Sequence, residues 1–407
     1  MSKFLIVGAG QAGLQLAFGL VQDGHDVTVI SNRTPDDVRT GKVMSSQCMF
    51  DAALEHERDL RINYWDQECP DIAGISLVVP TPDGGKMVDW AARLERPAQS
   101  VDQRLKMSLW MEEFEKQGGR IILDDVTVPD LEKHARENDL VIVAAGKGEV
   151  AQLFERNAAR SPYSAPQRSL ALTYVTGMEP RPEYSAVCFN LIPTVGEYFV
   201  FPALTATGEC EIMVFEGIPG GPMDCWGDVV TPDEHLAKSK WILETFLPWE
   251  AERCLNVELT DANGVLVGRF APTVRDPVGE LPSGALVLGL ADAVVLNDPI
   301  TGQGSNNASK AAASYLDSIR EHGDASYDRA FMQDAFDRYW DYAQYVTTWT
   351  NALLGPPPQH VLDLLIAGND HQQIAERFAN GFDNPPDFFD WFMEPAKATR
   401  YLEEVAA

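Results

Sequence analysis

Short apolar runs alternate with amphipathic stretches along the first third of the chain. Residues 3–7 form an apolar run that ends in glycine, residues 12–22 carry an apolar stripe with helical spacing, and residues 26–30 form a second apolar run. This order predicts a β-α-β unit of about thirty residues, the size of a nucleotide-binding half. The pattern further predicts a helix over 103–117, a strand over 120–123 and a buried strand of the parallel type over 140–146.

The middle of the chain is richer in strand patterns. Residues 71–95 hold an apolar run, a Pro-Asp-Gly-Gly turn at 82–85 and a second apolar stretch, which together predict a hairpin. From residue 169 to about 270 strand-like runs dominate, and one helix over 232–246 interrupts them. We therefore expect an antiparallel sheet in a second domain, with strands over 169–175, 186–191, 197–201, 210–215 and 264–269.

The last third begins with a short apolar strand over 285–290 and a helix over 306–321. Residues 326–395 are helical in pattern, and Pro356–Pro358 and Pro385–Pro386 break the helices. Strands of the parallel type alternating with helices, together with a separate antiparallel sheet, indicate an α/β protein of more than one domain.

Composition narrows the class of protein. No window reaches ~18 uninterrupted apolar residues, so we expect no membrane span. The N-terminus lacks a basic leader before a long apolar region, so we expect no signal peptide. Six cysteines lie far apart without a C-x-x-C pair, which predicts reduced thiols in a cytoplasmic protein and no metal site. A formal net charge of −29 repels nucleic acid and anionic lipid, so we expect neither as a partner.

A glycine-rich motif follows the first strand. Its sequence is Gly8-Ala9-Gly10-Gln11-Ala12-Gly13, a G-x-G-x-x-G that opens the first predicted helix. Such glycines allow a tight turn, close approach to a pyrophosphate and close helix–strand packing, and the helix N-terminus favours phosphate. The alternative is a glycine-rich turn that serves packing alone. An acid usually ends the second strand of an NAD site, but here the sequence is Ser31-Asn32-Arg33, which FAD proteins tolerate at the adenosine end.

A second signal lies almost 300 residues later. A strand over 286–289 leads to Asp292, and then Asp298-Pro299-Ile300-Thr301-Gly302-Gln303-Gly304-Ser305-Asn306 runs into a helix. Two glycines at a helix start form a nest that accepts an oxyanion. Together with the N-terminal motif, this segment resembles the flavoprotein monooxygenases of the p-hydroxybenzoate-hydroxylase fold.

That resemblance implies FAD as cofactor and assigns roles along the chain. Asp292 would hold the ribityl chain, and the loop 299–304 would lie against the flavin ring. Backbone N–H groups near Gly304, Ser305 and Asn306 would offset charge at the N1–C2=O edge of reduced flavin. The catalytic positions in this scheme are Pro299, Gly302, Gln303 and Gly304. The further cofactor positions are Gly146, Arg104, Lys42 and the turn Ser31-Asn32-Arg33. Arg104 and Lys42 could equally well be surface cations.

One fingerprint of the single-component aromatic hydroxylases is missing. Those enzymes carry an Asp-Gly that serves both FAD and NAD(P)H, whereas this chain reads Ala144-Ala145-Gly146-Lys147-Gly148 at that place. A flavoenzyme without a nicotinamide site receives reduced flavin from elsewhere. A halogenase of the same fold would carry W-x-W-x-I-P, which does not occur. A non-catalytic flavin carrier remains a third alternative, although it would not need the loop 298–304.

The chain is similar over nearly its whole length to the epoxidase components of styrene and indole monooxygenases. The segments that carry the likeness are 8–13, 100–104, 139–147, 166–168, 289–292, 298–308 and 348–351. Around the substrate pocket it resembles the indole branch, at Ser45, Gln47, Met49, Ile72, Ile75 and Ala98. The styrene branch has Asn, Val, His, Tyr, His and Ser there. Without the family resemblance, the six residues of this chain would be interpreted as ordinary core or loop positions.

The resemblance implies a two-component reaction. A separate NADH-dependent flavin reductase supplies FADH2, O2 adds to give a flavin C4a-hydroperoxide, and indole is epoxidised at its 2,3 bond to give 3-hydroxyindole and then indigo. Ser45, Gln47 and Met49 alternate, so in an extended segment they share one face, which we predict lines the cavity while Ser46 and Cys48 face away. The Gln47 carbonyl would accept the indole N–H. The alternatives are a styrene epoxidase of the same family and a single-component NAD(P)H-dependent hydroxylase.

The predicted architecture is therefore discontinuous. An FAD-binding domain of Rossmann type would comprise 1–70, 96–168 and 271–325, and a substrate-binding domain with the antiparallel sheet would comprise 71–95 and 169–270. Residues 326–407 would form a C-terminal helical region.

Overall fold

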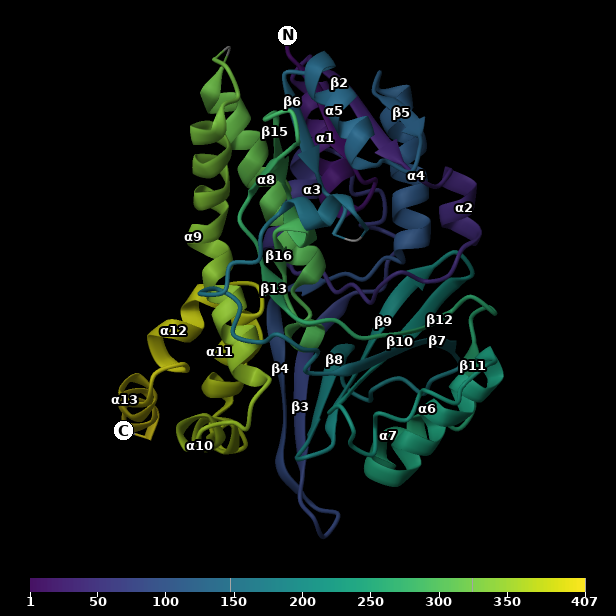
Figure 1. Cartoon of the computed structure of the whole chain (residues 1–407). Coiled ribbons are helices and arrows are strands. Elements are labelled where there is room, and N and C mark those ends of the chain that lie inside the picture. The colour runs from purple at the N-terminus through teal and green to yellow at the C-terminus, as the bar shows by residue number, and fades with distance from the viewer. Residues whose placement is uncertain (147, 324, 407) are drawn as a thin grey trace.

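The computed structural model describes residues 1–146, 148–323 and 325–406 and contains two main sheets. The smaller sheet has six strands in the order β14-β15-β6-β1-β2-β5. Its strands β2, β5, β6 and β15 are labelled in the upper part of Figure 1. Only β14 runs antiparallel to its neighbour, and the other pairs are parallel, as the apolar runs predict. The strands are β1 (Lys3–Val7), β2 (Asp26–Ser31), β5 (Arg120–Leu123), β6 (Leu140–Val143), β14 (Val278–Glu280) and β15 (Leu286–Gly289).

The larger sheet has the order β11-β7-β10-β9-β8-β3-β4, and β12 also pairs with β7. The prediction of an antiparallel sheet is wrong at one place, because β3 pairs in parallel with β8. More than a hundred residues separate these two strands, so no hairpin turn dictates their relative direction. The strands are β3 (Ile72–Pro80), β4 (Lys86–Ala98), β7 (Ser169–Thr176), β8 (Ala186–Ile192), β9 (Gly196–Thr205), β10 (Gly208–Gly217), β11 (Glu258–Leu259) and β12 (Val265–Gly268). A small separate pair joins β13 (Thr273–Val274) and β16 (Val295–Leu296).

The helices surround both sheets. Their bounds are α1 (Gln11–Gln22), α2 (Pro35–Thr40), α3 (Asp51–Asp59), α4 (Gln103–Lys116), α5 (Val128–Glu137), α6 (Pro232–Phe246), α7 (Pro248–Arg253), α8 (Gly304–His322), α9 (Arg329–Leu353), α10 (Gln359–Ala367), α11 (Gln372–Gly381), α12 (Phe388–Trp391) and α13 (Pro395–Ala406). The predicted helix over 232–246 is confirmed as α6, which Thr231 and Glu234 begin with a capping box. The pattern missed α2 and α5, which are short and mostly polar, although both also begin with a Thr-x-x-Asp capping box.

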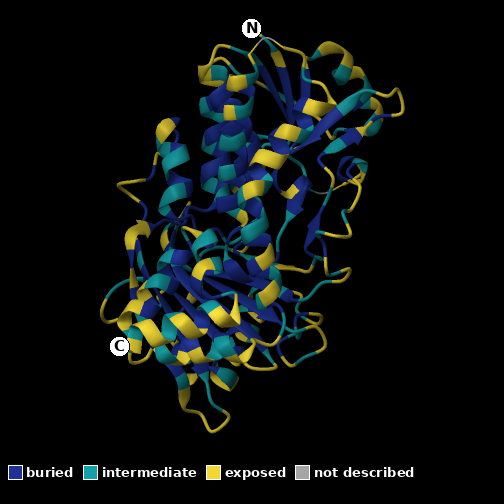
Figure 2. Ribbon diagram, turned by 90° about the vertical axis from the view of Figure 1, so that its left-hand side faces the viewer, coloured by how far each residue is buried: buried dark blue, intermediate teal, exposed yellow. Residues whose placement is uncertain are grey.

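The two faces of the larger sheet pack against different partners. One face, with Tyr198, Val200 and Met213, packs against Ile242 and Leu243 of α6, and Trp249 of α7 packs against the same cluster. The opposite face meets the C-terminal helices, which lie beside the β3–β4 hairpin in Figure 1. Figure 2 shows buried strands through both sheets and exposed residues on the outer helices and the hairpin tip. No helix in the described part of the chain has the length and apolarity that a membrane crossing needs.

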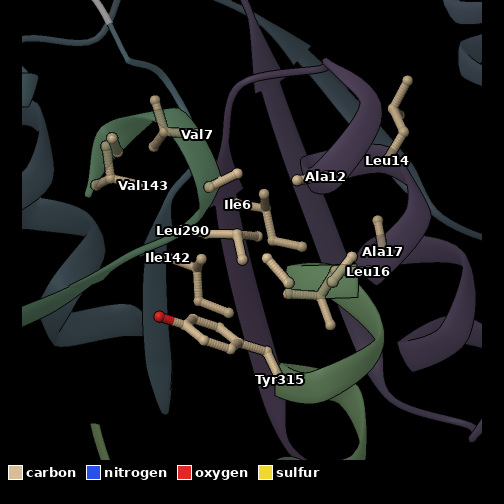
Figure 3. Packing of buried hydrophobic residues seen from close by; sticks show 14 of the residues in the cluster. Ile6, Val7, Ala12, Leu14, Leu16, Ala17, Ile142, Val143, Leu290 and Tyr315 are labelled. Atoms are coloured by element: carbon tan, nitrogen blue, oxygen red, sulfur yellow. The ribbon is translucent and has the colours of Figure 1, made fainter. Parts of the chain in front are cut away.

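The core of the smaller sheet places the ends of three parallel strands side by side. Figure 3 shows Ile6, Ile142 and Leu290 packed together against α1 and against Tyr315 of α8. The Tyr315 hydroxyl donates to the carbonyl of Gly289 at 2.8 Å, which ties α8 to the end of β15. Burying each of these side chains contributes about 1.5–3 kcal/mol. These contacts fix the positions of the carboxyl ends of β1, β6 and β15 relative to α1 and α8.

Candidate active site

The three glycines of the G-x-G-x-x-G motif have different structural tasks. Gly8 has φ +115°, and a Cβ there would lie 3.1 Å from backbone atoms of Ala144 and Ala145. A Cβ on Gly13 would lie 2.0 Å from the Gly8 carbonyl oxygen, so this glycine permits the close contact of α1 with β1. A Cβ on Gly10 would meet nothing within 4 Å. Open space therefore lies in front of the first turn of α1.

Three chain segments meet at this edge of the sheet. The neighbouring strands β1, β6 and β15 end at the glycine motif, at Gly146 and at Asp292, respectively. A Cβ on Gly146 would lie 2.9 Å from the Asp292 Cβ, and the Asp292 side chain is exposed. At the end of β2, the Ser31 hydroxyl donates to the Arg33 carbonyl at 2.8 Å, and Asn32 and Arg33 are exposed. Lys147 lies outside the described residues.

The loop before α8 is built on a short 3₁₀ helix, η3 (Pro299–Thr301). Asp298 caps it by accepting from the Ile300 N–H at 3.2 Å, and Gly302 ends it in the left-handed region with φ +63°. A Cβ on Gly302 or on Gly304 would meet nothing within 4 Å. The buried Gln303 amide donates to the Phe382 carbonyl at 2.9 Å, which fixes the loop to the C-terminal region.

An apolar cavity lies beside this loop. Its wall comes from the segment 46–50, from β8, β9 and β10, and from Phe382. None of the described lining residues is charged. The lining residues are Ser46, Cys48, Phe50, Val187, Phe189, Phe199, Phe201, Val214, Pro299, Thr301, Gly302 and Phe382. Sequence reasoning predicted the strands that carry these aromatic residues but not which of their faces meets the loop.

The segment 45–50 does alternate, but in the opposite phase to our prediction. Ser46, Cys48 and Phe50 line the cavity. Gln47 is turned away from it: its amide nitrogen donates to the Tyr174 hydroxyl at 3.3 Å, and its carbonyl accepts from the Ser45 hydroxyl at 3.2 Å. The predicted outward orientation of Ser46 and Cys48 is therefore wrong.

Pairing explains the phase of this segment. The backbones of Met49 and Gln99 exchange hydrogen bonds of 2.8 and 2.9 Å, and Met49 packs with Ala53 and Leu54. The Asn306 side chain bonds both the Phe50 N–H and the Cys48 carbonyl, at 2.8 Å each. The other three positions of the substrate pattern, Ile72, Ile75 and Ala98, are fully buried in the same hydrophobic cluster as the cavity wall. They lie behind the wall and do not line the cavity.

The two cations assigned to the cofactor differ in environment. Arg104 is buried and bonds Asp102 at 2.9 Å and both oxygens of Asp261 at 3.0 Å. Burial lowers the pKa of Arg104, but hydrogen bonds to Asp261 and Asp102 outweigh it and raise the pKa above the ordinary value. This guanidinium also joins α4 to Asp261 of the strand-rich region. Lys42, in contrast, is exposed beside Gly41.

The residues at this edge fit FAD. The first turns of α1 and α8 carry no acidic side chain, and the N-terminal glycines of both helices, Gly10 and Gly304, face open space. Two positive helix ends without a carboxylate favour an anionic ligand at each. Gly8–Gly13 would hold the pyrophosphate, Asp292 the ribityl chain, and the 299–304 loop with the start of α8 the ring.

Solved structures share this architecture. The flavin-dependent brominase Bmp2 aligns with a TM-score of 0.65 at 14% identity, over 91% of this chain and 90% of the brominase. PqsL of P. aeruginosa, in complex with 2-aminobenzoylacetate, aligns with a TM-score of 0.59 at 16% identity, over 94% of this chain and 99% of PqsL. The predicted p-hydroxybenzoate-hydroxylase-like fold is confirmed. This is the fold of the FAD-dependent monooxygenases and halogenases.

Sequence comparison specifies the family. The chain is 30% identical to the styrene monooxygenase StyA of Pseudomonas fluorescens, over 98% of this chain and 97% of that protein, and equally so to StyA of a Pseudomonas species. Residues 146–253 match the family model described as "Styrene monooxygenase A putative substrate binding domain". The chain belongs to the styrene monooxygenase StyA family, as an oxygenase component of the StyA type, and membership implies FAD.

Proposed function

We propose that this chain epoxidises the double bond of a small, neutral aryl alkene, with reduced FAD supplied by a separate flavin reductase. The observation that carries the proposal is the cavity beside the 299–302 loop, which is walled by aromatic and aliphatic side chains without a charge. Such a wall suits an uncharged aromatic molecule, because an anionic or cationic substrate would be desolvated there without a partner.

The protein's own contribution is binding, orientation and the exclusion of water. Bound reduced FAD would supply the activation of O2. Phe189, Phe199 and Phe201 would hold the aromatic ring, while Pro299 and Gly302 would set its distance from the flavin. Epoxidation of an electron-rich double bond needs no ionised side chain, so the apolar lining agrees with this reaction. Excluding water limits wasteful release of hydrogen peroxide.

Two substrates are proposed in order. A styrene-type alkene comes first, because the relatives over the full length are styrene monooxygenases. Indole comes second, because the chain carries the indole pattern at Ser45, Gln47, Met49, Ile72, Ile75 and Ala98. We propose that this pattern acts by shaping the cavity from behind its wall, since Ile72, Ile75 and Ala98 pack in the same cluster as the wall residues.

The two-component reaction is tested with purified chain. With FAD and NADH alone, we expect no substrate-dependent oxygen consumption, because the Asp-Gly that serves NAD(P)H is missing at 144–148. Addition of a flavin reductase should produce styrene oxide from styrene, and blue pigment from indole if the second substrate is accepted. Turnover of NADH or NADPH with substrate by the chain alone would contradict the proposal.

Substrate choice is tested at the segment 45–50. Ser46 is the serine of this segment that lines the cavity. We propose that its hydroxyl accepts the indole N–H. Ser46→Ala should remove one neutral hydrogen bond of about 0.5–1.5 kcal/mol, and kcat/KM for indole should fall roughly 2- to 13-fold relative to styrene. Gln47→Val is the comparison, because Ser45 and Tyr174 already engage the Gln47 amide. If kcat/KM for indole relative to styrene falls more in Gln47→Val than in Ser46→Ala, Gln47 and not Ser46 is the residue that contacts indole.

A further inference from the structure

Four ionisable side chains gather behind the 299–302 loop. They come from four separate parts of the chain: Arg168 before β7, Glu197 on β9, Glu216 on β10 and Asp298 before η3. Their residue exposures are 5%, 8%, 0% and 2%, respectively, so the whole group is screened from water. Buried charges need partners, and the reaction proposed above uses none of these four groups.

The single cation of the group is already engaged. Arg168 bonds both oxygens of Glu197, at 2.6 and 2.8 Å, and also donates to the Gln167 carbonyl at 2.9 Å. Glu197 and Glu216 are direct partners in the β9–β10 register, which brings their side chains to the same face of the sheet. The nearby pair of Asp224 with Arg269, at 3.1 Å, is a separate contact.

Glu216 has no ordinary donor. Neither of its oxygens is met by an N–H or a hydroxyl among the residues that the structure describes. The Asp298 carboxyl acts on Glu216 both through its charge and as a side-chain hydrogen-bonding neighbour, and each effect raises the pKa of Glu216. Two carboxyl groups form a hydrogen bond only when one of them carries a proton, because two carboxylates repel each other and neither can donate.

The electrostatics agree with a retained proton. Burial raises the pKa of Glu216 well above its ordinary value, and the negative charges of Asp298 and Glu197 add to this effect. Burial also raises the pKa of Asp298 to about 6, against the opposing influence of its bond from Ile300 and of Arg168. Because the two carboxyl groups act on each other, their protons leave in two steps that belong to the pair, and the second proton leaves at a higher pH than the first.

Asp298 connects this pair to the cavity. The same carboxyl that bonds Glu216 also accepts from the Ile300 N–H at 3.2 Å and so caps η3. Two residues of this short helix, Pro299 and Thr301, line the cavity, and so does Gly302 at its end. Any movement of Asp298 away from Glu216 would carry the loop with it.

We propose that Glu216 and Asp298 share one proton and thereby fasten the 299–302 loop to the end of β10, so that both are positioning residues for the active site. Loss of that proton places two carboxylates side by side and releases the loop. The inference concerns the order of the loop in the chain itself. Its test needs neither FAD nor substrate, so it can fail or succeed independently of the proposed function.

The expected pH dependence follows from linkage. The unfolded chain releases the Glu216 proton near the ordinary pKa of 4.5, whereas the folded chain keeps it to higher pH. Between these two pKa values the folded state binds more protons, so its stability falls as the pH rises, by about tenfold in the unfolding equilibrium constant per pH unit for one proton. Above the folded pKa this contribution becomes constant.

The experiment compares the full chain with Glu216→Gln from about pH 6 to about pH 10, a range that spans the pKa of documented buried glutamates. Glutamine keeps a neutral N–H donor toward Asp298 at every pH. Hydrogen–deuterium exchange, corrected for the intrinsic rate, reports the protection of the Ile300 and Gly302 amides. Denaturant unfolding over the same range reports the global effect. Glu209→Gln is the matched control, because Glu209 is exposed on the same strand and loses the same charge.

We expect loop protection in the unaltered chain and in Glu209→Gln to fall by about tenfold per pH unit up to the folded pKa of Glu216 and to become constant above it. In Glu216→Gln it should stay level, and this variant should be the more stable one at alkaline pH. The proposal is overturned if loop protection depends on pH equally in the unaltered chain and in Glu216→Gln. It is also overturned if loop protection in the unaltered chain does not change with pH. If Glu216→Gln does not fold, Asp298→Asn is the second variant. Its loop protection should stay level with pH, because no pair of carboxylates forms, whereas its global stability should still fall with pH, because Glu216 remains buried.

Discussion

Replacing Lys106 by methionine should lower the free energy of unfolding by about 3–5 kcal/mol, because it leaves a buried carboxylate without its counter-charge. Lys106 and Glu57 form an ion pair of 2.7 Å with side-chain exposures of 4% and 0%. The same Glu57 oxygen accepts from Gln11, the first residue of α1, at 2.9 Å. We therefore expect two losses in this variant. The free energy of unfolding should fall in denaturant unfolding, and the affinity for FAD should fall in a flavin titration.

The control for this prediction lies on the same helix. Lys116 of α4 pairs with Glu113 at 2.7 Å, but its side chain is 66% exposed, so water replaces the lost partner. Lys116→Met should leave the unfolding midpoint nearly unchanged. Replacing both buried partners, as Lys106→Met with Glu57→Leu, should restore much of the stability, because no unpaired charge remains. Similar losses in Lys106→Met and Lys116→Met would refute the argument from burial.

Substitutions of the second and third glycines of the N-terminal motif should have different effects. Gly13→Ala brings a methyl group to 2.0 Å from the Gly8 carbonyl oxygen and 3.2 Å from its carbon, and a backbone contact cannot relax by rotation of a side chain. Overpacking of this kind costs about 1–3 kcal/mol and sometimes more, so we expect a loss at the upper end in denaturant unfolding.

Gly10→Ala should instead spare the fold, because its methyl group meets nothing within 4 Å. The same methyl group would occupy space that the pyrophosphate needs. If the clash costs about 1–3 kcal/mol, FAD affinity falls roughly 5- to 150-fold in a flavin titration. Gly227→Ala is the matched control, since it too has open space but lies away from the motif. Unaltered FAD affinity in Gly10→Ala would show that the pyrophosphate does not bind beside Gly10.

Local signals explain what could be predicted from the sequence. The G-x-G-x-x-G motif, the capping box before α6 and the apolar runs of β1, β2 and β6 each act within a few residues, so their pattern is visible without the fold. The glycine nest at 302–304 was likewise predicted, and Gly302 does adopt a left-handed conformation. Class, fold and family were therefore accessible from the chain alone.

The lining of the cavity was not accessible in this way. Alternation along 45–50 is a local property, but its phase depends on Gln99 and Asn306, which are separated from the segment by about 50 and 256 residues. A shift of one residue in such a segment exchanges its two faces. The aromatic wall on β8 and β9 and the contribution of Phe382 depend in the same way on how the larger sheet meets the loop.

The glycine turns, the helix starts and the strand runs were predictable from the chain alone, and the family resemblance added the flavin-dependent class. The parallel pairing of β3 with β8, the position of Cys48 in place of Gln47 at the cavity, and the proximity of Glu216 to Asp298 appear only in the folded molecule. The physical reason is distance along the chain. Backbone preferences and caps are set by neighbouring residues, whereas strand direction, the phase of an extended segment and the pairing of buried charges are set by partners that only folding brings together.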